Sequence, residues 1–479
     1  MDYKDFIESK TQQTGNHGFD PIWMPDILFP FQVALVEWAI RKGRAAIFAD
    51  CGLGKTFMQL VWAENVACHT NGRVLILTPL AVAFQTVKEG VKIGVEVAHR
   101  RDELHQDDRI IVTNYERLHH FNQNDFAGIV CDESSILKHF SGSTQKNVTR
   151  FMSKIPYRLL CTATAAPNDY IELGTSSMAL GELSHSEMLK RFFRQLDDKG
   201  QKSERKKQLE AENISEAAPQ HYQRLAYRVA QSIGQWRLKN HAVDDFWKWV
   251  SSWARACRMP SDLGFSDKGF ILPSLNERDH IIEVNTPPDG YLFTMTAFGL
   301  SEEREERKRT INERCEFIAQ LVNHDRPAVV WCHTNAEGDL LEKVIPNARQ
   351  VAGRTPDDEK ESAYNDFVSG GLRVLVIKPK IGAWGLNWQH CNHVVTFASH
   401  SYEQYYQSVR RCWRFGQKNP VDLDVVATEG EVRVIANMKR KALQSDIMFK
   451  KLVEHMNADT IIKRENNIIK EMESPKWLS

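Results

Sequence analysis

The stretch 49–56, ADCGLGKT, contains the residue types that a bound triphosphate requires. It follows a short apolar run and precedes a helix-forming run, which is the strand–loop–helix context of a P-loop. Gly52 and Gly54 let backbone amides approach phosphate oxygens, because no Cβ stands in the way. Lys55 is expected to reach the β- and γ-phosphates and Thr56 to hold Mg²⁺. This context disfavours the alternative of an ordinary glycine-containing turn, although alanine occupies the first position, where the motif commonly has glycine.

Two adjacent carboxylates, Asp132 and Glu133, follow the apolar run Gly128–Cys131. Neighbouring residues of a strand point to opposite faces, but at a strand end the chain can turn both toward one site. Asp132 is expected in the Mg²⁺ shell, and Glu133 is expected to orient or deprotonate an attacking water. Alone, such a pair is as well explained by a solvated turn. Downstream of a P-loop it favours triphosphate hydrolysis.

A third group of residues, 407–417 (QSVRRCWRFGQ), contains three arginines and no acidic residue. On a helix, Gln407, Arg411 and Arg414 would lie at i, i+4 and i+7 and share one face. Uncompensated guanidinium groups need an anion, and arginines supplied to a γ-phosphate accelerate its transfer by about 10³–10⁵-fold. The alternative is a basic surface helix that binds nucleic acid.

Two sets of short apolar runs must position these groups. The expected strands are 45–49, 74–78, 110–113, 128–131 and 158–161 in the first set, and 328–332, 373–377, 393–397 and 423–426 in the second. Helical patterns separate many of them, which indicates parallel sheets covered on both faces. Ligands bind at the carboxyl ends of such strands. The expected fold class is therefore α/β, with two parallel-sheet lobes and a mostly helical insertion between them.

The expected organisation has four parts: a nucleotide-binding lobe one at 1–175, an insertion at 176–275, lobe two at 276–430 and a helical tail at 431–479. Within the insertion, the run 190–207 has eight basic and three acidic residues. A contact with nucleic-acid phosphates and a solvated face explain this run equally well. The polar stretch 199–220 is expected to form a mobile loop.

Composition limits the class of protein. The 479 residues include 62 basic and 62 acidic side chains, so any basic surface must be local. Hydrophobic residues make up 42% and charged residues 26%, which excludes a mostly disordered chain. Nine cysteines without a CxxC pair favour a reducing compartment. The polar start MDYKDFIESK and the lack of an 18-residue apolar run predict a cytoplasmic protein without a membrane partner.

The order of the motifs resembles that of superfamily two helicases. The matching strings are LFPFQ at 28–32 (the adenine-reading Q motif), ADCGLGKT (motif I), LTP at 77–79 (motif Ia), DESS at 132–135 (the DEAD/DEAH box), TAT at 162–164 (motif III), WGLN at 384–387 (motif V) and 407–417 (motif VI). The form QxxxRxxRxGQ, with GLGKT and LFPFQ, is most similar to Swi/Snf-like ATPases. The chain is more closely similar to the compact Snf-type helicases that bacteriophages and prophages encode.

The resemblance implies two RecA-like lobes with ATP and Mg²⁺ in the cleft between them. The implied ATP-site residues are Gln32, Gly52, Gly54, Lys55, Thr56, Asp132 and Glu133 in lobe one, and Gly385, Gln407, Arg411 and Arg414 in lobe two. By position, the implied nucleic-acid contacts are Thr78, Thr113, Asn114, His333 and Lys380.

The implied function is an ATP-dependent translocase or helicase that acts on duplex or branched DNA, in the host cytoplasm if phage-encoded. A replication or DNA-modification protein is the expected kind of protein partner. One departure concerns Ser135, which stands where similar proteins have a coupling histidine. Two alternatives stay open: a nucleotide-gated clamp on nucleic acid with little turnover, and an RNA-directed helicase. An unrelated P-loop kinase would leave the second α/β unit and the arginines unexplained.

Overall fold

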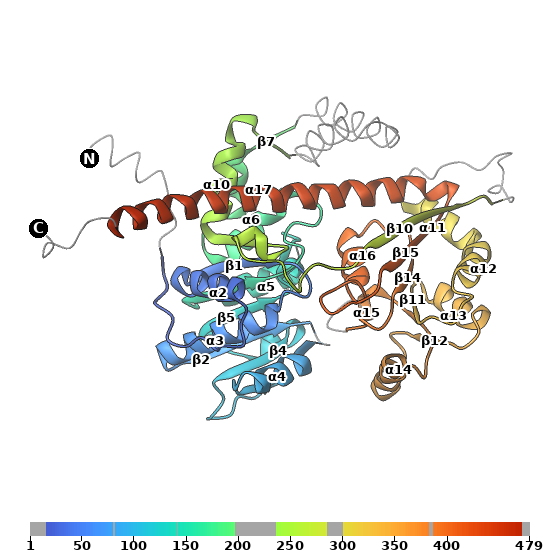
Figure 1. The fold of residues 1–479 in the computed structure, drawn as a ribbon, viewed down its shortest axis with the longest axis horizontal. Helices are drawn as coiled ribbons and strands as arrows, with labels where there is room; N and C mark the ends of the chain where they lie inside the picture. Colours follow the sequence, from blue (N-terminus) through green and yellow to red (C-terminus); the bar gives the residue numbers. More distant parts are fainter. Residues whose placement is uncertain are drawn as a thin grey trace, which may run out of the picture. The chain divides into compact units, whose positions relative to one another are not determined.

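The computed structural model describes residues 16–79, 82–140, 142–196, 236–284, 300–382 and 387–471. These residues form two compact units. Lobe one contains the described residues before 197, residues 236–267 and those from 444 onward, and lobe two contains the described part of 268–443. In Figure 1 the strands of lobe one are mostly blue to green, and most elements of lobe two are yellow to orange.

Lobe one is built on a parallel sheet. Within the described residues its strands lie in the order β3 (Val97–His99), β4 (Ile110–Asn114), β2 (Arg73–Thr78), β5 (Phe126–Asp132), β6 (Tyr157–Cys161), β1 (Arg44–Ala49) and β9 (Ala254–Cys257). All their pairings are parallel. β1, β2 and β5 are nearly continuous apolar runs, because helices cover both faces of the sheet.

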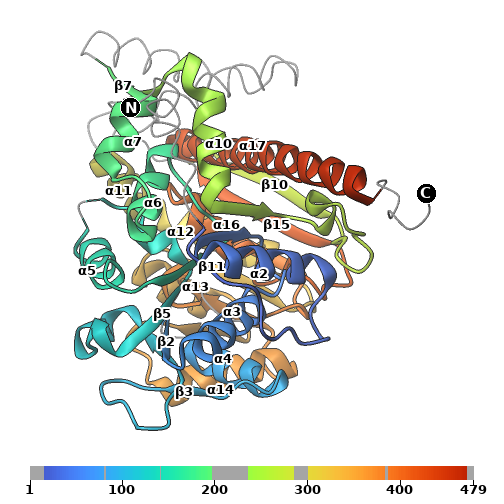
Figure 2. The same cartoon turned by 90° about the vertical axis from the view of Figure 1, so that its left-hand side faces the viewer.

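Helices form the two outer layers of lobe one (Figure 2). One face carries α2 (Pro30–Lys42), α3 (Lys55–Thr70) and α4 (Ala83–Lys92), and the other carries α5 (Ser143–Met152), α6 (Leu173–Leu180), α7 (His185–Phe192) and α10 (Val243–Trp253). A short antiparallel pair, β7 (Phe193–Gln195) and β8 (Trp236–Leu238), follows α7 and precedes α10.

Lobe two repeats this plan. Its strands, as far as the structure describes them, lie in the order β10 (Leu275–Ile282), β15 (Val421–Thr428), β14 (His393–Phe397), β11 (Ala328–Trp331), β13 (Val374–Ile377) and β12 (Ala348–Val351), all parallel. The helices of this part of the chain are α11 (Leu300–Arg309), α12 (Ile311–Leu321), α13 (Asn335–Val344), α14 (Asp357–Ser369), α15 (Pro379–Gly382), α16 (Tyr402–Val409) and the start of α17 (Val432–Glu471). Separate apolar clusters fill the two faces of the sheet.

The expected fold class, α/β with two parallel-sheet lobes, is confirmed. Every expected strand is present, with ends that differ by at most three residues. The sequence patterns missed β3, β9, β10 and β12, which are the edge strands of the two sheets. Edge strands carry more polar residues, so their patterns resemble those of loops, as in the mostly exposed Leu275–Ile282.

β9 shows what the segment 176–275 contributes. It pairs with β1, which is the strand that leads into the P-loop. Helix α10 precedes it directly, and Trp247 and Trp253 of that helix are buried in the core of lobe one. These tryptophans therefore anchor α10 to lobe one. The four-part division of the chain stays a prediction, and the structure adds that residues 236–257 complete lobe one.

In the segment expected as a tail, the structure has helix α17, with bounds Val432–Glu471. Nowhere in the described ranges does a helix combine the length and apolarity needed to cross a bilayer. The expected mobile loop 199–220 lies outside the described residues, as do residues 197–207 of the basic run.

Candidate nucleotide site

The P-loop connects β1 to α3. Gly52 and Gly54 have φ of 88° and 74°, in the left-handed region that side chains with a Cβ rarely adopt. Gly54 caps the N-terminus of α3, and Lys55 begins the helix, so backbone N–H groups and the positive end of the helix dipole lie beside the loop. The Nζ of Lys55 donates to the carbonyl oxygens of Ala49 (3.0 Å) and Asp50 (3.2 Å). This local geometry suits a phosphate chain.

The Gln32 side chain packs against the P-loop and forms a hydrogen bond with it. Its Nε2 donates to the Leu53 carbonyl at 2.8 Å, and its Oε1 accepts from the Phe29 backbone N–H at 2.9 Å. A Cβ at Gly54 would lie 2.3 Å from this Nε2, so a larger residue there would displace the Gln32 amide as well as strain the backbone. The structure therefore places Gln32 against the loop, while adenine recognition by Gln32 stays a prediction.

The acidic pair lies at the carboxyl end of β5. Asp132 and Glu133 are 6% and 9% exposed, so both carboxylates are largely withdrawn from water. Burial, followed by the charge of Glu133, raises the pKa of Asp132 to about 7, although the Gln59 amide and the charge of Lys55 act in the opposite direction. A buried carboxylate with a raised pKa is a common feature of a functional site, where a bound cation would stabilise its ionised form.

Two further side chains contact this pair. The Nε2 of Gln59 donates to Asp132 Oδ1 at 2.6 Å, and the Oγ1 of Thr162 donates to Glu133 Oε2 at 3.3 Å. Thr162 belongs to the TAT string of the resemblance, but its contact could not be read from spacing. Gln59 lies one helical turn after Lys55 on α3, so the i, i+4 pattern was an available signal for it.

The arginine segment of lobe two differs from the expectation. Helix α16 ends at Val409, so Gln407, Arg411 and Arg414 do not share the face of one helix. The chain turns at Arg410, whose guanidinium packs over the Trp413 ring at 4.6 Å. The expectation of a continuous helix was wrong, because past Val409 the backbone hydrogen bonds form only single turns, from the N–H groups of Cys412 and Trp413 to the carbonyl of Val409.

Arg411 nevertheless stays beside Gln407. Its guanidinium donates to the side-chain Oε1 of Gln407 at 2.9 Å and to the backbone carbonyl of Gln407 at 3.2 Å. Arg414 donates to Asn387, the last residue of the WGLN string, which pattern reasoning had not assigned to the site. Gly385 lies outside the described residues.

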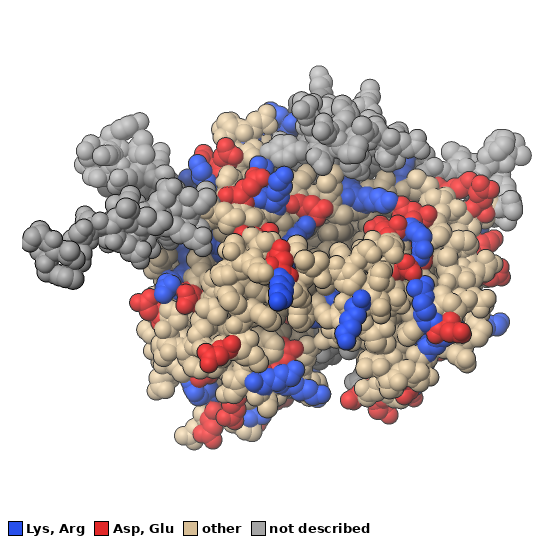
Figure 3. Space-filling view, viewed as in Figure 1, with Lys and Arg blue, Asp and Glu red and all other residues tan. Residues whose placement is uncertain are grey.

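Most of the residues expected to contact nucleic acid have other contacts or are buried. Thr78 and Thr113 are 0% and 1% exposed, and Asn114 accepts from the Arg117 N–H, capping the 3₁₀ helix Tyr115–His120. Lys380 is exposed. On the face shown in Figure 3, basic and acidic side chains of the described residues are interspersed.

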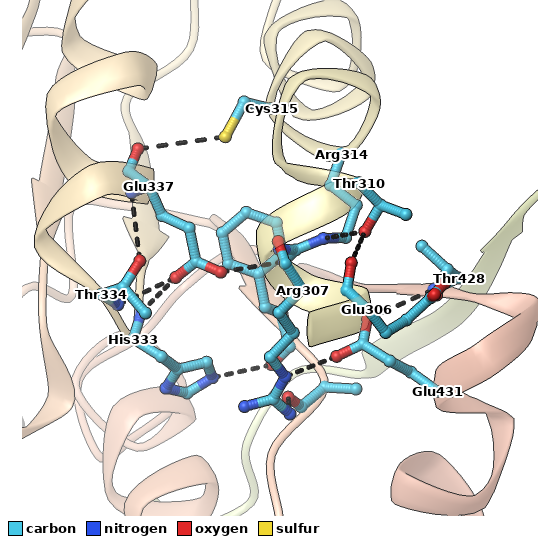
Figure 4. A network of polar contacts seen from close by, with 12 residues as sticks. Glu306, Arg307, Thr310, Arg314, Cys315, His333, Thr334, Glu337, Thr428 and Glu431 are labelled. Atoms are coloured by element: carbon cyan, nitrogen blue, oxygen red, sulfur yellow. Dashed lines mark hydrogen bonds and ion pairs between the residues drawn. The ribbon is translucent and has the colours of Figure 1, made fainter. Parts of the chain in front are cut away.

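His333, the remaining candidate, belongs to a buried polar network at the carboxyl ends of β11, β14 and β15 (Figure 4). Glu337 Oε2 accepts from the backbone N–H groups of His333 and Thr334, both at 2.9 Å, and its Oε1 accepts from Arg314 at 2.9 Å. The His333 ring contacts the Phe397 carbonyl at 3.2 Å, and burial lowers its pKa. A neutral, engaged ring is a poorer phosphate contact than a free cation.

The same network continues to α11 and to the turn after β15. Arg307 donates to Glu431 at 2.6 Å, and Glu306 accepts from the Thr428 hydroxyl at 2.8 Å. A Cβ at Gly430 would lie 2.8 Å from the Glu306 carboxyl, so a larger residue there would displace this side chain. Each of these acids has a fixed partner within lobe two, which indicates a structural role for the network.

Comparison with known proteins supplies the class of protein. The fold is a two-lobe α/β architecture with a parallel sheet in each lobe, and a P-loop-like turn follows β1. Residues 311–416, which include α12 to α16 and the arginine segment, match the family model described as "Helicase conserved C-terminal domain". This match confirms, for lobe two, the expected resemblance to helicases.

Individual similar proteins cover different shares of the chain. The bifunctional helicase and thymine dioxygenase JBP2 of Leishmania braziliensis is 31% identical over 121 residues, 24% of this chain and 11% of that protein. The protein of the same name from Leishmania tarentolae is 33% identical over 111 residues, 22% and 10% of the two chains. The chain thus matches about a tenth of the length of these curated relatives. A solved structure, the Sulfolobus solfataricus SWI2/SNF2 ATPase core in complex with dsDNA, has a TM-score of 0.40 and 17% identity, covering 91% of this chain and 96% of its own.

Proposed function

We propose that this chain is an ATP-dependent DNA translocase or helicase of superfamily two, similar to Swi/Snf-like ATPases. One observation carries the proposal: the same chain combines a P-loop beside a buried acidic pair with a helicase C-terminal domain that includes Arg411 and Arg414. A P-loop kinase needs the first feature and has no use for the second.

In this proposal the P-loop holds the phosphates of ATP through Lys55 and the amides around Gly52 and Gly54. Thr56 and Asp132 hold Mg²⁺, and their hydroxyl and carboxylate oxygens are the donors that this hard cation prefers. When bound, Mg²⁺ neutralises charge on the phosphates.

Glu133 orients or deprotonates the attacking water, and Thr162 holds its carboxylate through the hydrogen bond at 3.3 Å. Arg411 and Arg414 supply positive charge to the γ-phosphate during turnover. DNA is proposed as the polymer because the motif set resembles that of Swi/Snf-like ATPases.

The decisive experiment measures phosphate release by the purified chain with single-stranded DNA, duplex DNA, forked DNA and RNA side by side. Duplex or forked DNA is expected to stimulate hydrolysis most. Lys55→Ala should lower the stimulated rate at least about 10³-fold, because the phosphates lose their fixed cation. Lys146→Ala, at an exposed position of α5, is the matched control and should stay within about twofold of the wild type.

Other outcomes lead to the alternatives. Tight ATP-dependent binding of DNA without turnover above background would indicate the clamp, and stimulation by RNA alone would indicate an RNA-directed helicase. Displacement of a triplex-forming strand from duplex DNA supports translocation, whereas activity only on forks supports strand separation.

A further inference from the structure

Glu133 has an unusual backbone conformation. Its φ of 48° and ψ of 52° lie in the left-handed region. Of the described non-glycine residues with positive φ, the other two are Asn71 and Asn347, and asparagine tolerates this region because its short side chain bonds locally. A glutamate adopts it only where the surroundings enforce it, and such enforced residues cluster at active sites.

The conformation has a direct effect on the site. It turns the chain sharply at the end of β5, so that the 3₁₀ helix Ser134–Leu137 begins at the next residue. An extended continuation would point successive side chains to opposite faces of the sheet. The turn therefore lets Asp132 and Glu133 contribute to one site.

A side-chain hydrogen bond from a neighbouring strand end holds the peptide that makes this turn. The phenol Oη of Tyr115 donates to the backbone carbonyl of Asp132 at 2.6 Å. That carbonyl belongs to the peptide group joining Asp132 to Glu133, so its direction is coupled to the φ of Glu133. Tyr115 is 6% exposed, and burial raises the pKa of its phenol well above the usual value, so the O–H stays protonated and available as a donor.

The bond also connects two strands that are not neighbours. Tyr115 directly follows β4, and β2 lies between β4 and β5 in the sheet. The Tyr115 phenol therefore extends past β2 to the end of β5, where the acidic pair lies. Thr113 and Asn114, which precede Tyr115, are the last residues of β4. They lie at the carboxyl end of this strand, and the motif resemblance implies that they contact nucleic acid.

We propose that Tyr115 is a positioning residue for Glu133: its hydrogen bond to the Asp132 carbonyl holds the left-handed turn and makes hydrolysis sensitive to the position of the β4 end. This inference rests on the proposed function, because it assumes that Glu133 acts in ATP hydrolysis. Tyr115 itself touches neither nucleotide nor water in this proposal.

The test is Tyr115→Phe, which keeps the ring in the core and removes only the donor. The stimulated kcat should fall about 10- to 100-fold, because a displacement near 1 Å at a reacting group has an effect of that size. The KM for ATP and the affinity for a fluorescent ADP analogue should stay within about twofold, and DNA stimulation should shrink with kcat. Unchanged kcat would overturn the inference, as would an equal loss of nucleotide affinity.

Tyr170→Phe is the matched control. Tyr170 is 3% exposed in the same core cluster, and its ring packs against Trp247 at 5.1 Å, outside the acidic pair. This variant should retain kcat within about twofold. A loss as large as that of Tyr115→Phe would show that any buried phenol matters equally and would overturn the positioning role.

A second variant covers the case in which Tyr115→Phe does not fold. Para-aminophenylalanine at position 115 keeps the ring and a weaker donor, and should show a kcat below that of the wild type at unchanged KM. A rate equal to that of the wild type would refute the inference. If the wild type itself hydrolyses no ATP with any nucleic acid, the proposed function has failed, and this result is distinct from a Tyr115 variant that matches an active wild type.

Discussion

Asp132 in lobe one and Glu337 in lobe two are both buried carboxylates near the carboxyl end of a parallel strand, yet their surroundings differ. Burial raises the pKa of Glu337 too, but the Arg314 guanidinium and two backbone N–H groups outweigh it and leave this pKa below its usual value. Asp132 has an amide, a more distant lysine and a second carboxylate, and its pKa is raised to about 7.

The difference separates a structural acid from a functional one. Glu337 has its counter-charge built into the chain at 2.9 Å, so its ionised form is stable without a ligand. The ionised form of Asp132 becomes equally stable only when a further cation binds beside it. A buried acid that the fold does not neutralise is therefore better evidence of a ligand site than burial or motif membership alone.

The largest expected effect tests the functional side of this comparison. Glu133→Gln should abolish DNA-stimulated ATP turnover, a loss of at least about 10³-fold, because an amide cannot accept the proton of the attacking water. Phosphate release measures it. Stability should not fall, because the change removes one of two adjacent buried charges. Near-normal hydrolysis would refute the role assigned to Glu133.

Arg414→Ala should have a comparable or somewhat smaller effect, a drop of about 10³-fold in kcat with nucleotide affinity within about threefold. Because Arg414 is only partly buried and its contact with Asn387 lies in an exposed setting, the unfolding midpoint should hardly change. Arg354→Ala is the control, since Arg354 forms a surface ion pair with Asp339, 64% and 45% exposed, and such pairs contribute little. Loss of ATP binding in Arg414→Ala would contradict a role limited to turnover.

Glu337→Gln tests the structural side. Arg314 is fully buried and would lose its anionic partner, which costs about 3–5 kcal/mol of unfolding free energy. Urea denaturation measures this loss, and turnover per folded molecule should stay close to that of the wild type. Replacing both partners, as in Arg314→Met with Glu337→Leu, should recover part of it, because no lone charge is then buried. A fully stable Glu337→Gln would remove the contrast with Asp132.

The smallest effect concerns pH. The folded-state pKa of Asp132, about 7, lies above the unfolded value near 3.9, so the stability that its protonation supplies is lost as pH rises through this range. Without Mg²⁺, the wild type should lose about 2–3 kcal/mol relative to Asp132→Asn between pH 5 and pH 8. Thermal unfolding at four pH values measures the difference, and Mg²⁺ with nucleotide should reduce it. If stability changed with pH in the same way in both proteins, the pKa of Asp132 would not be raised by its surroundings.

Much of the fold was predictable because its signals are local. The P-loop, the strand before it and the acidic pair each follow from adjacent residues whose backbone freedom and apolarity are written in one stretch. Arg411 shows how far local spacing can be used. The spacing from Gln407 placed both residues on one side of the chain, and they are in contact. The helix that was expected to carry Arg414 as well ends at Val409.

The sequence by itself determined which chemistry is present: glycines that tolerate positive φ, a lysine at a helix start, two acids after a buried strand and arginines without acids. These properties depend on covalent structure and on neighbours within a few residues. Only the tertiary structure decided which groups are neutralised and which are held, as in Gln59 on Asp132, Tyr115 on the Asp132 carbonyl and Arg314 on Glu337. Those contacts join residues 17 to 73 positions apart, and their energies depend on burial that exists only once the sheets are formed.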